Sequence, residues 1–151
     1  MSMRIAIGSD HGGYELKEKI KSYLRSSDHD VVDFGTDSLD SVDYPDYGKR
    51  VGEAIVSGGY DFGIVLCGTG IGISIAANKV KGVRAALVYD EETGRLAKEH
   101  NNANIIALGG RTTTYEKAVA ILNAFMSSSY EPRHQKRLDK IKDIEESLND
   151  E

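Results

Sequence analysis

Five short apolar runs alternate with amphipathic segments along the chain, and this alternation constrains the fold more than any other feature. The runs occupy residues 4–8, 31–34, 62–66, 83–88 and 104–108. Short runs of this kind are typical of buried strands. Apolar residues recur every four positions within 14–24 and 47–56, which predicts helices with one buried face.

Repeated strand–helix alternation predicts a parallel sheet with right-handed crossovers and helices on both faces. We therefore expect an α/β fold, a Rossmann-like three-layer α/β/α sandwich with a five-stranded parallel sheet. A chain of 151 residues can bury one sizeable core, so residues 1–151 are expected to form a single domain.

A charged C-terminal helix is predicted at about 133–149. Its apolar residues recur three or four positions apart, and they are Leu138, Ile141, Ile144 and Leu148. An amphipathic helix of this type can dock on its own domain or on a partner subunit.

Charge and composition limit the partners and the compartment. Lys and Arg number 19 against 24 Asp and Glu, so the net charge is -5 and nucleic acid is not an expected partner. No apolar run approaches the roughly 18 residues that cross a bilayer, so no membrane association is expected. The single cysteine, Cys67, cannot form an intrachain disulfide, which favours a reducing compartment, the cytoplasm.

In an open α/β sheet, ligands bind beyond the carboxyl ends of the strands. The loops that follow the predicted strands hold most of the unusual residues, at positions 9–13, 36–45, 67–72, 90 and 109–111. The third of these loops reads Cys67-Gly68-Thr69-Gly70-Ile71-Gly72. Its three glycines allow a tight turn whose N–H groups converge ahead of a helix, which predicts an anion site.

Three common anion sites fit this loop poorly, and the Walker loop fits it least. A Walker nucleotide loop needs Lys and Ser or Thr after its last glycine, where this chain has Ile73. A dinucleotide loop needs a G-x-G-x-x-G pattern in the first strand–helix unit, whereas this one is G-x-G-x-G in the third. A cysteine phosphatase would carry an arginine six residues after the cysteine, and that position is again Ile73.

A fourth interpretation, which we favour, is that the anion is an enediolate, formed when a base removes the proton between the carbonyl and hydroxyl carbons of an open-chain sugar. The N–H groups would then act as an oxyanion hole. A place ahead of a helix favours the thiolate form of Cys67, as a general base requires. The alternative is that Cys67 is only a small buried apolar residue.

Asp10 and His11 follow the first predicted strand, at the same end of the sheet as Cys67. An acid–imidazole pair there could open a sugar ring, since one group takes the anomeric proton and another protonates the ring oxygen. Asp10 could instead cap the next helix. His100 and Asn101 end a predicted helix, where a histidine is often only a favourable charge against the helix dipole.

Arg111, Arg133 and Arg137 are candidate phosphate ligands, and the last two share a helical face. They could equally belong to a solvated basic surface. His134 is ambiguous in the same way. The four histidines show no metal-ligand spacing and one cysteine cannot build a structural zinc site, so no metal is expected.

Several motifs together resemble the B-type ribose-5-phosphate isomerases and their galactose-6-phosphate isomerase relatives over essentially the whole chain. The motifs are Gly8-Ser9-Asp10-His11-Gly12-Gly13, Asp43-Tyr44-Pro45, Cys67-Gly68-Thr69-Gly70-Ile71-Gly72, His100-Asn101-Ala103-Asn104 and Arg133-His134. The resemblance implies a Rossmann-like homodimer, or a tetramer, that binds a sugar phosphate without a metal or nucleotide cofactor. It also implies a site shared between subunits, with the C-terminal helix packing on or near the partner.

The resemblance implies specific roles as well. Cys67 would accept the proton, His100 would donate one during ring opening, and the N–H groups of Gly68, Thr69, Gly70, Ile71 and Gly72 would hold the enediolate. The sugar would contact Asp10, His11, Tyr44, Thr69 and Asn101, and the phosphate would lie at or near His11, Arg111, Arg133 and Arg137. How Asp10, His11, Thr69 and His100 divide the ring opening stays open.

One branch of the family lacks this cysteine and uses a glutamate at the position of Ile73, so the chain resembles the cysteine branch. The same cysteine argues against the incomplete subunit type of the galactose-6-phosphate enzyme. Pro132 departs from the family pattern, where relatives can have glycine. A six-carbon sugar phosphate and a non-catalytic sugar-phosphate-binding regulator remain alternatives.

Overall fold

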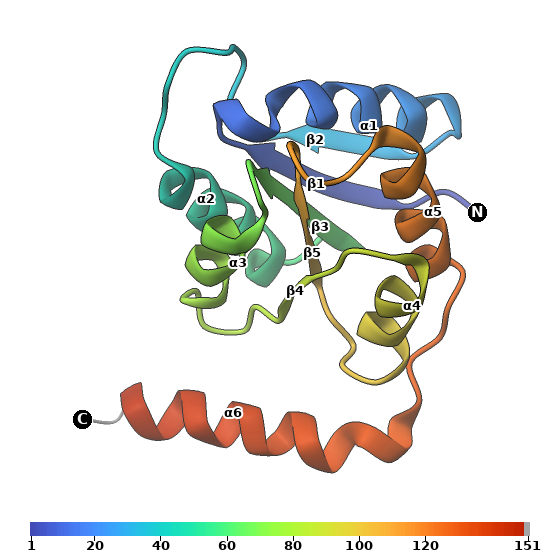
Figure 1. The fold of residues 1–151 in the computed structure, drawn as a ribbon. Helices are drawn as coiled ribbons and strands as arrows, with labels where there is room; N and C mark the ends of the chain where they lie inside the picture. Colours follow the sequence, from blue (N-terminus) through green and yellow to red (C-terminus); the bar gives the residue numbers. More distant parts are fainter. Residues whose placement is uncertain (150–151) are drawn as a thin grey trace.

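The fold is described from a computed structural model over residues 1–149 (Figure 1). The strands are β1 (Arg4–Ser9), β2 (Asp30–Asp33), β3 (Phe62–Cys67), β4 (Ala85–Leu87) and β5 (Ile105–Gly109). The α-helices are α1 (Tyr14–Ser26), α2 (Tyr44–Ser57), α3 (Ile71–Asn78), α4 (Glu91–Glu99), α5 (Tyr115–Met126) and α6 (Gln135–Asn149). Two short 3₁₀ turns are η1 (His11–Gly13) and η2 (Pro132–His134).

All strand pairs in the sheet are parallel, and the strand order is β2-β1-β3-β5-β4. The predicted α/β fold with five parallel strands is therefore confirmed. The order reverses between β1 and β3, because the chain places β2 on one side of β1 and β3 on the other. Such a switch point leaves a crevice between the loops that follow the two strands.

Helices cover both faces of the sheet (Figure 1). Ile5 and Ile7 of β1 pack into one core cluster with residues of α1, α4 and α5. Ala6, between them, belongs to the second cluster, which α2 and α3 cover. Alternate strand residues point to opposite faces, so both faces of β1 are apolar, as a central parallel strand requires.

Two predicted boundaries were wrong. The fourth apolar run, predicted as a strand over 83–88, pairs only from Ala85 to Leu87, because β4 is an edge strand with one neighbour. The second helix begins at Tyr44 rather than near 47, and Pro45 lies in its first turn, where a missing N–H costs no hydrogen bond.

The predicted C-terminal helix is present as α6 and begins after η2. It lies along the β4 side of the molecule rather than on a face of the sheet (Figure 1). Leu138 is buried, whereas Ile141 and Ile144 are 48% and 61% exposed. The side chain of Leu148 lies outside the described part of the chain. The apolar stripe of α6 is therefore only partly covered by its own domain.

Among residues 1–149, no helix has both the length and the apolar character that a membrane span requires.

Candidate active site

Cys67 is the last residue of β3 and is 5% exposed. Its Sγ accepts a hydrogen bond from the N–H of Gly70 at 3.1 Å. Gly70 has φ of +81°, and α3 starts at the next residue. A donated N–H and a helix N-terminus both favour negative charge on the sulfur. The sulfur therefore faces a backbone donor and the N-terminus of α3, and Cys67 is also a buried residue of the second core cluster.

The glycine loop is fixed to the segment that follows β5. Its Cys67 and Gly68 carbonyls accept hydrogen bonds from the N–H groups of Gly110 and Arg111, at 2.8 and 2.9 Å. The N–H of Ile71 donates to the Thr69 hydroxyl oxygen at 3.2 Å. The loop is therefore held in one conformation by backbone hydrogen bonds, as a preorganised oxyanion site requires.

Asp10 follows β1 at the switch point and is 7% exposed. Its Oδ1 accepts the N–H of Gly13 at 3.1 Å, so the carboxylate does cap η1, as the capping alternative predicts. The loop after β1 also comes close to the glycine loop. If Gly12 carried a Cβ atom, that atom would lie only 2.9 Å from the backbone N of Gly68. Asp10 therefore lies two residues before a loop residue that is directly beside the glycine loop.

His11 accepts the N–H of Val42 at its Nδ1, at 3.1 Å. An accepting Nδ1 assigns the proton of the neutral ring to Nε2. The predicted ring-opening pair thus consists of a largely buried carboxylate and an imidazole that can donate through Nε2.

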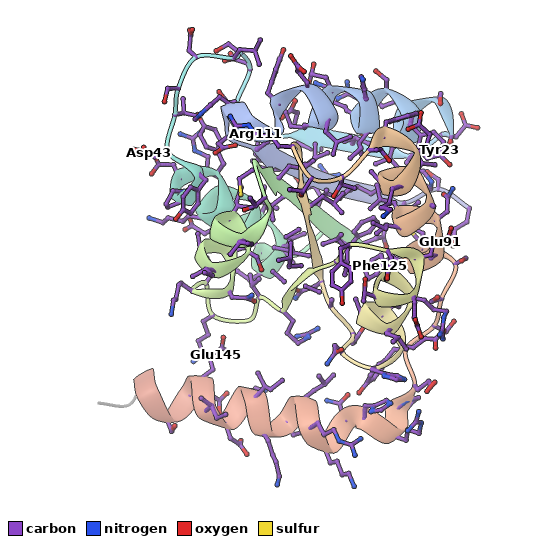
Figure 2. All side chains as sticks on the ribbon, viewed as in Figure 1. Tyr23, Asp43, Glu91, Arg111, Phe125 and Glu145 are labelled. Carbon is purple, nitrogen blue, oxygen red and sulfur yellow. The ribbon has the colours of Figure 1, made fainter. Side chains whose placement is uncertain are left out.

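Tyr44 and Arg111 border the glycine loop from two sides. A Cβ on Gly72 would lie 2.6 Å from Cζ of Tyr44, and one on Gly68 would lie 3.0 Å from Nη1 of Arg111. Figure 2 shows Arg111 at the end of the sheet opposite to α6, which carries Glu145. The predicted residues at this end are therefore brought together, and they are Asp10, His11, Tyr44, Cys67, Gly68, Thr69, Gly70, Ile71, Gly72 and Arg111.

A second polar cluster lies at the C-terminal end of α4. The rings of His100 and His134 are 4.5 Å apart, and their Nε2 atoms lie 4.0 and 3.9 Å from Oε1 of Glu131. Arg133 pairs with that carboxylate at 2.8 Å, and Arg137 Nη1 lies 3.0 Å from His134 Nδ1. Sequence spacing missed this proximity of two histidines and a glutamate.

The second cluster is positively charged overall. Burial lowers the pKa of His134, and the positive charges of Arg133, His100 and Arg137 lower it further. The hydrogen bond from Arg133 lowers the pKa of Glu131 and keeps its carboxylate ionised. Three side chains of metal-ligand type, two imidazoles and a carboxylate, do converge here. Two guanidinium groups beside one carboxylate nevertheless favour an anion over a metal cation.

The two clusters lie at opposite ends of the sheet. His100 and Asn101 precede β5, whereas Arg111 follows it, and a five-residue strand spans about 16 Å. Asn101 lines a groove of about 240 Å³ between β4 and α6 instead of the crevice near Cys67. Within one chain, His100, Asn101, Arg133 and Arg137 are therefore not brought to Cys67.

The chain is similar to known sugar-phosphate isomerases along its length. The Ribose/Galactose Isomerase family matches residues 5–141. The galactose-6-phosphate isomerase subunit LacB of Clostridium acetobutylicum is 46% identical over 99% of this chain and 86% of its own length. The ribose-5-phosphate isomerase B of Escherichia coli is 42% identical over 97% of this chain and 99% of its own.

A solved structure of Clostridium thermocellum ribose-5-phosphate isomerase B is 49% identical and covers 97% of this chain and 99% of its own. It superposes with a TM-score of 0.95. Family match, sequence identity and fold agree with the resemblance seen in the loop motifs, and the chain belongs to the Ribose/Galactose Isomerase family.

Proposed function

We propose that the protein interconverts ribose 5-phosphate and ribulose 5-phosphate through an enediolate, with Cys67 as the base. The observation that carries this proposal is the hydrogen bond from Gly70 N–H to Cys67 Sγ, at a helix N-terminus within the switch-point crevice. Relatives named ribose-5-phosphate isomerase B support the choice of sugar.

In the proposed reaction, the thiolate of Cys67 takes the proton from C2 of the open-chain aldose. The electron pair of that C–H bond forms a C1–C2 double bond, and the carbonyl electrons move to O1. The N–H groups of the glycine loop stabilise the charge on oxygen. Return of the proton to C1, with transfer of the O2 proton to O1, gives the ketose, so no cofactor is needed for the electron balance.

Ring opening precedes this step for an aldose. His11 is suited to donate a proton to a ring oxygen or hydrogen-bond the phosphate through Nε2–H, and the Asp10 carboxylate is suited to accept the anomeric proton. Thr69 and His100 are the further candidates for this step. His100 would act from a second chain, because the His100 of the same chain as Cys67 lies at the far end of β5.

We further propose a homodimer, or a tetramer built from it, in which each site combines the crevice of one chain with the second cluster of its partner. An open-chain five-carbon sugar phosphate is shorter than the separation of the two clusters within one chain. Exposed apolar residues on α3, β4 and the following loop supply a surface for a second copy, and they are Ile71, Ile75, Leu87 and Tyr89. The exposed stripe of α6 would pack on or near this partner.

In this arrangement Arg133 and Arg137 of the partner, with Arg111 and His11 of the first chain, bind the phosphate. Asn101 and Tyr44 contact the sugar. The proposed site of action is the cytoplasm, as the single free cysteine suggests.

A six-carbon sugar phosphate is the alternative substrate, and the relative named as a galactose-6-phosphate isomerase subunit supports it. A panel of five- and six-carbon sugar phosphates compared by kcat/KM decides between them. Proton exchange at C2 of the aldose in deuterated water separates an isomerase from a binding protein. The Cys67→Ala variant should bind the preferred substrate without exchanging this proton, and full turnover by that variant would exclude Cys67 as the base.

A further inference from the structure

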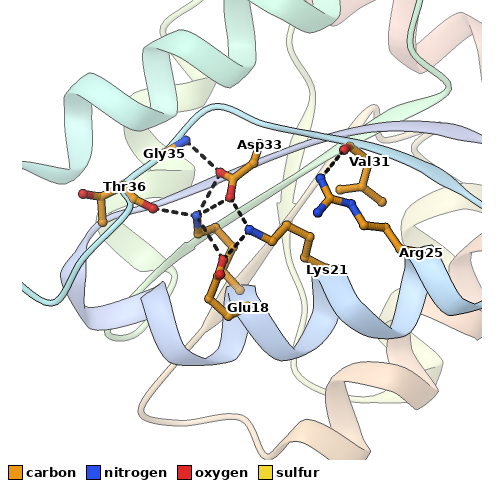
Figure 3. Close-up of polar contacts among 8 residues, drawn as sticks. Glu18, Lys21, Arg25, Val31, Asp33, Gly35 and Thr36 are labelled. Atoms are coloured by element: carbon orange, nitrogen blue, oxygen red, sulfur yellow. Dashed lines mark hydrogen bonds and ion pairs between the residues drawn. The ribbon is translucent and has the colours of Figure 1, made fainter.

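Lys17 of α1 is fully buried although its ammonium group carries a charge. Its Nζ donates to both carboxylate oxygens of Asp33, at 2.8 and 2.7 Å, and to the carbonyl oxygen of Thr36, at 2.6 Å (Figure 3). An ammonium group has three N–H donors, and these contacts occupy them. Lys17 therefore acts on the protein rather than on a ligand.

Asp33 is the centre of this cluster. It also accepts hydrogen bonds from Lys21 Nζ and from the N–H of Gly35, each at 2.8 Å. Burial alone would raise the pKa of Asp33, but the hydrogen bonds from Lys17, Lys21 and Gly35 outweigh burial and hold its pKa below the ordinary value. Glu18 pairs with Lys21 at 2.6 Å, so two cations and two anions balance at this place.

The segment held by Lys17 is bonded on its other side to the end of β1. Ser9 N–H donates to the Gly35 carbonyl, and Thr36 N–H donates to the Ser9 carbonyl, both at 2.6 Å. Ser9 is the residue immediately before Asp10. The ammonium group of Lys17 thus fixes the backbone of residues 33–36, to which the end of β1 just before Asp10 is hydrogen-bonded.

The same segment leads to the contact that holds His11. Beyond Thr36, the chain runs without helix or strand as far as Tyr44. Val42 in this stretch donates to His11 Nδ1. Lys17 therefore anchors the start of a loop whose far part sets the tautomer and orientation of His11.

The Cys67 loop has a support of its own. Its carbonyls are bonded to Gly110 and Arg111, beyond β5. The two halves of the crevice are consequently supported from different sides, one by α1 and β2, the other by β5.

We propose that Lys17 is a positioning residue for ring opening: through Asp33 and Thr36 it places Asp10 and His11, and it leaves the proton transfer at Cys67 unaffected. This inference rests on the proposed function. Misplacement of a reacting group by about 1 Å can lower a rate by about 100-fold, so loss of the ammonium group should be visible in the step that Asp10 and His11 serve.

The two substrates separate the steps. Ribose 5-phosphate is mainly cyclic and must be opened before its C2 proton is removed. Ribulose 5-phosphate cannot close a five-membered ring because its C5 oxygen is esterified, so exchange of its C1 proton with deuterated water needs only the enediolate step. Both rates can be measured on the same preparation by NMR.

Both rates are compared at saturating substrate, so that a weakened phosphate contact of His11 does not enter the comparison. For Lys17→Met we expect kcat for ribose 5-phosphate to fall by about tenfold or more, while C1 exchange of ribulose 5-phosphate falls by less than about threefold. Lys17→Arg keeps the charge and should restore part of the loss. Lys19→Met, at an exposed lysine of the same helix, should leave both rates unchanged.

If Lys17→Met fails to fold, the double variant Lys17→Met/Asp33→Asn is used instead, because it removes both charges and leaves no unpaired carboxylate. The same two rates are then measured on it. Equal loss of both rates, or no loss of either, overturns the positioning role and leaves Lys17 as a stabilising residue only. Absence of C1 exchange in the unaltered protein would instead refute the proposed isomerisation, and the two failures are thereby distinguished.

Discussion

Replacing Gly70 by alanine tests how the shape of the glycine loop controls Cys67. Gly70 has φ of +81°, and its N–H donates to Cys67 Sγ at 3.1 Å. An added Cβ would lie 2.8 Å from the carbonyl carbon of Leu108 and 2.8 Å from Cδ1 of Leu87. The leucine side chain can move, but the backbone of β5 cannot, so the loop has to shift.

The left-handed conformation costs a non-glycine residue about 1–2 kcal/mol, and overpacking adds about 1–3 kcal/mol. The free energy of unfolding should therefore fall by about 2–5 kcal/mol. A hydrogen bond to a charged group contributes about 1.5–3 kcal/mol, and each 1.36 kcal/mol is tenfold in rate, so kcat should fall by about 10- to 100-fold.

Urea denaturation measures the stability, and initial rates well below the melting temperature measure kcat. The rate of alkylation by iodoacetamide at fixed pH reports the thiolate population without turnover, and it should fall together with kcat. Gly58→Ala is the matched control. Gly58 also has positive φ, +90°, but an added Cβ there meets no atom within 4 Å.

Gly58→Ala should lose about 1–3 kcal/mol of stability and keep its kcat. A Gly70→Ala variant with nearly unchanged kcat would refute the role assigned to the Gly70 N–H. Equal losses of kcat in both variants would show that backbone strain alone, and not the contact with Cys67, lowers the rate.

Three further predictions concern the second cluster. The inactive variants Cys67→Ala and His100→Asn can be unfolded and refolded together in equal amounts. The mixture should regain about a quarter of the original activity, because half of the dimers are mixed and each mixed dimer has one intact site of two. No recovery of activity would exclude a shared site. Arg137→Ala should raise KM for the sugar phosphate by about 10- to 100-fold with a smaller change in kcat, because a charge-assisted contact is lost; an unchanged KM removes Arg137 from the phosphate site. Burial, together with Arg133, His100 and Arg137, holds the pKa of His134 below its ordinary value of 6.5. The unfolded chain therefore binds this proton more readily, and the free energy of unfolding should fall as the pH drops below about 6.5. Between pH 7.5 and 5.5 the free energy of unfolding should change less for His134→Gln than for the unaltered protein, and an equal change would exclude this source of pH dependence.

The sequence predicted the sheet well and also the end of the sheet at which its loops gather, because both depend on local patterns. Apolar runs mark strands wherever both faces are covered, as in β1, β3 and β5. Such a run does not reveal how many residues pair at an edge, so β4 was predicted too long. The crevice followed from strand direction alone, since loops after neighbouring parallel strands meet at one end.

The second cluster could not be predicted in the same way. His100 and His134 approach because η2 docks against the end of α4, where the N–H of Glu131 donates to the Glu99 carbonyl at 2.9 Å. That contact joins segments about thirty positions apart and leaves no periodic pattern. The contact of Lys17 with Asp33 could not be predicted either. The apolar neighbours of Lys17 indicate a buried helix face, but only the placement of β2 beside α1 brings Asp33 to its ammonium group.

The separation of the two clusters along β5 also bears on gene dosage. With shared sites, every chain contributes to both reaction centres of its dimer, so a defective chain impairs a centre that also contains residues of its normal partner. At protein concentrations well below the dimer dissociation constant, activity would rise with the square of the amount of chain rather than in proportion to it. Dilution would then silence the enzyme without unfolding it.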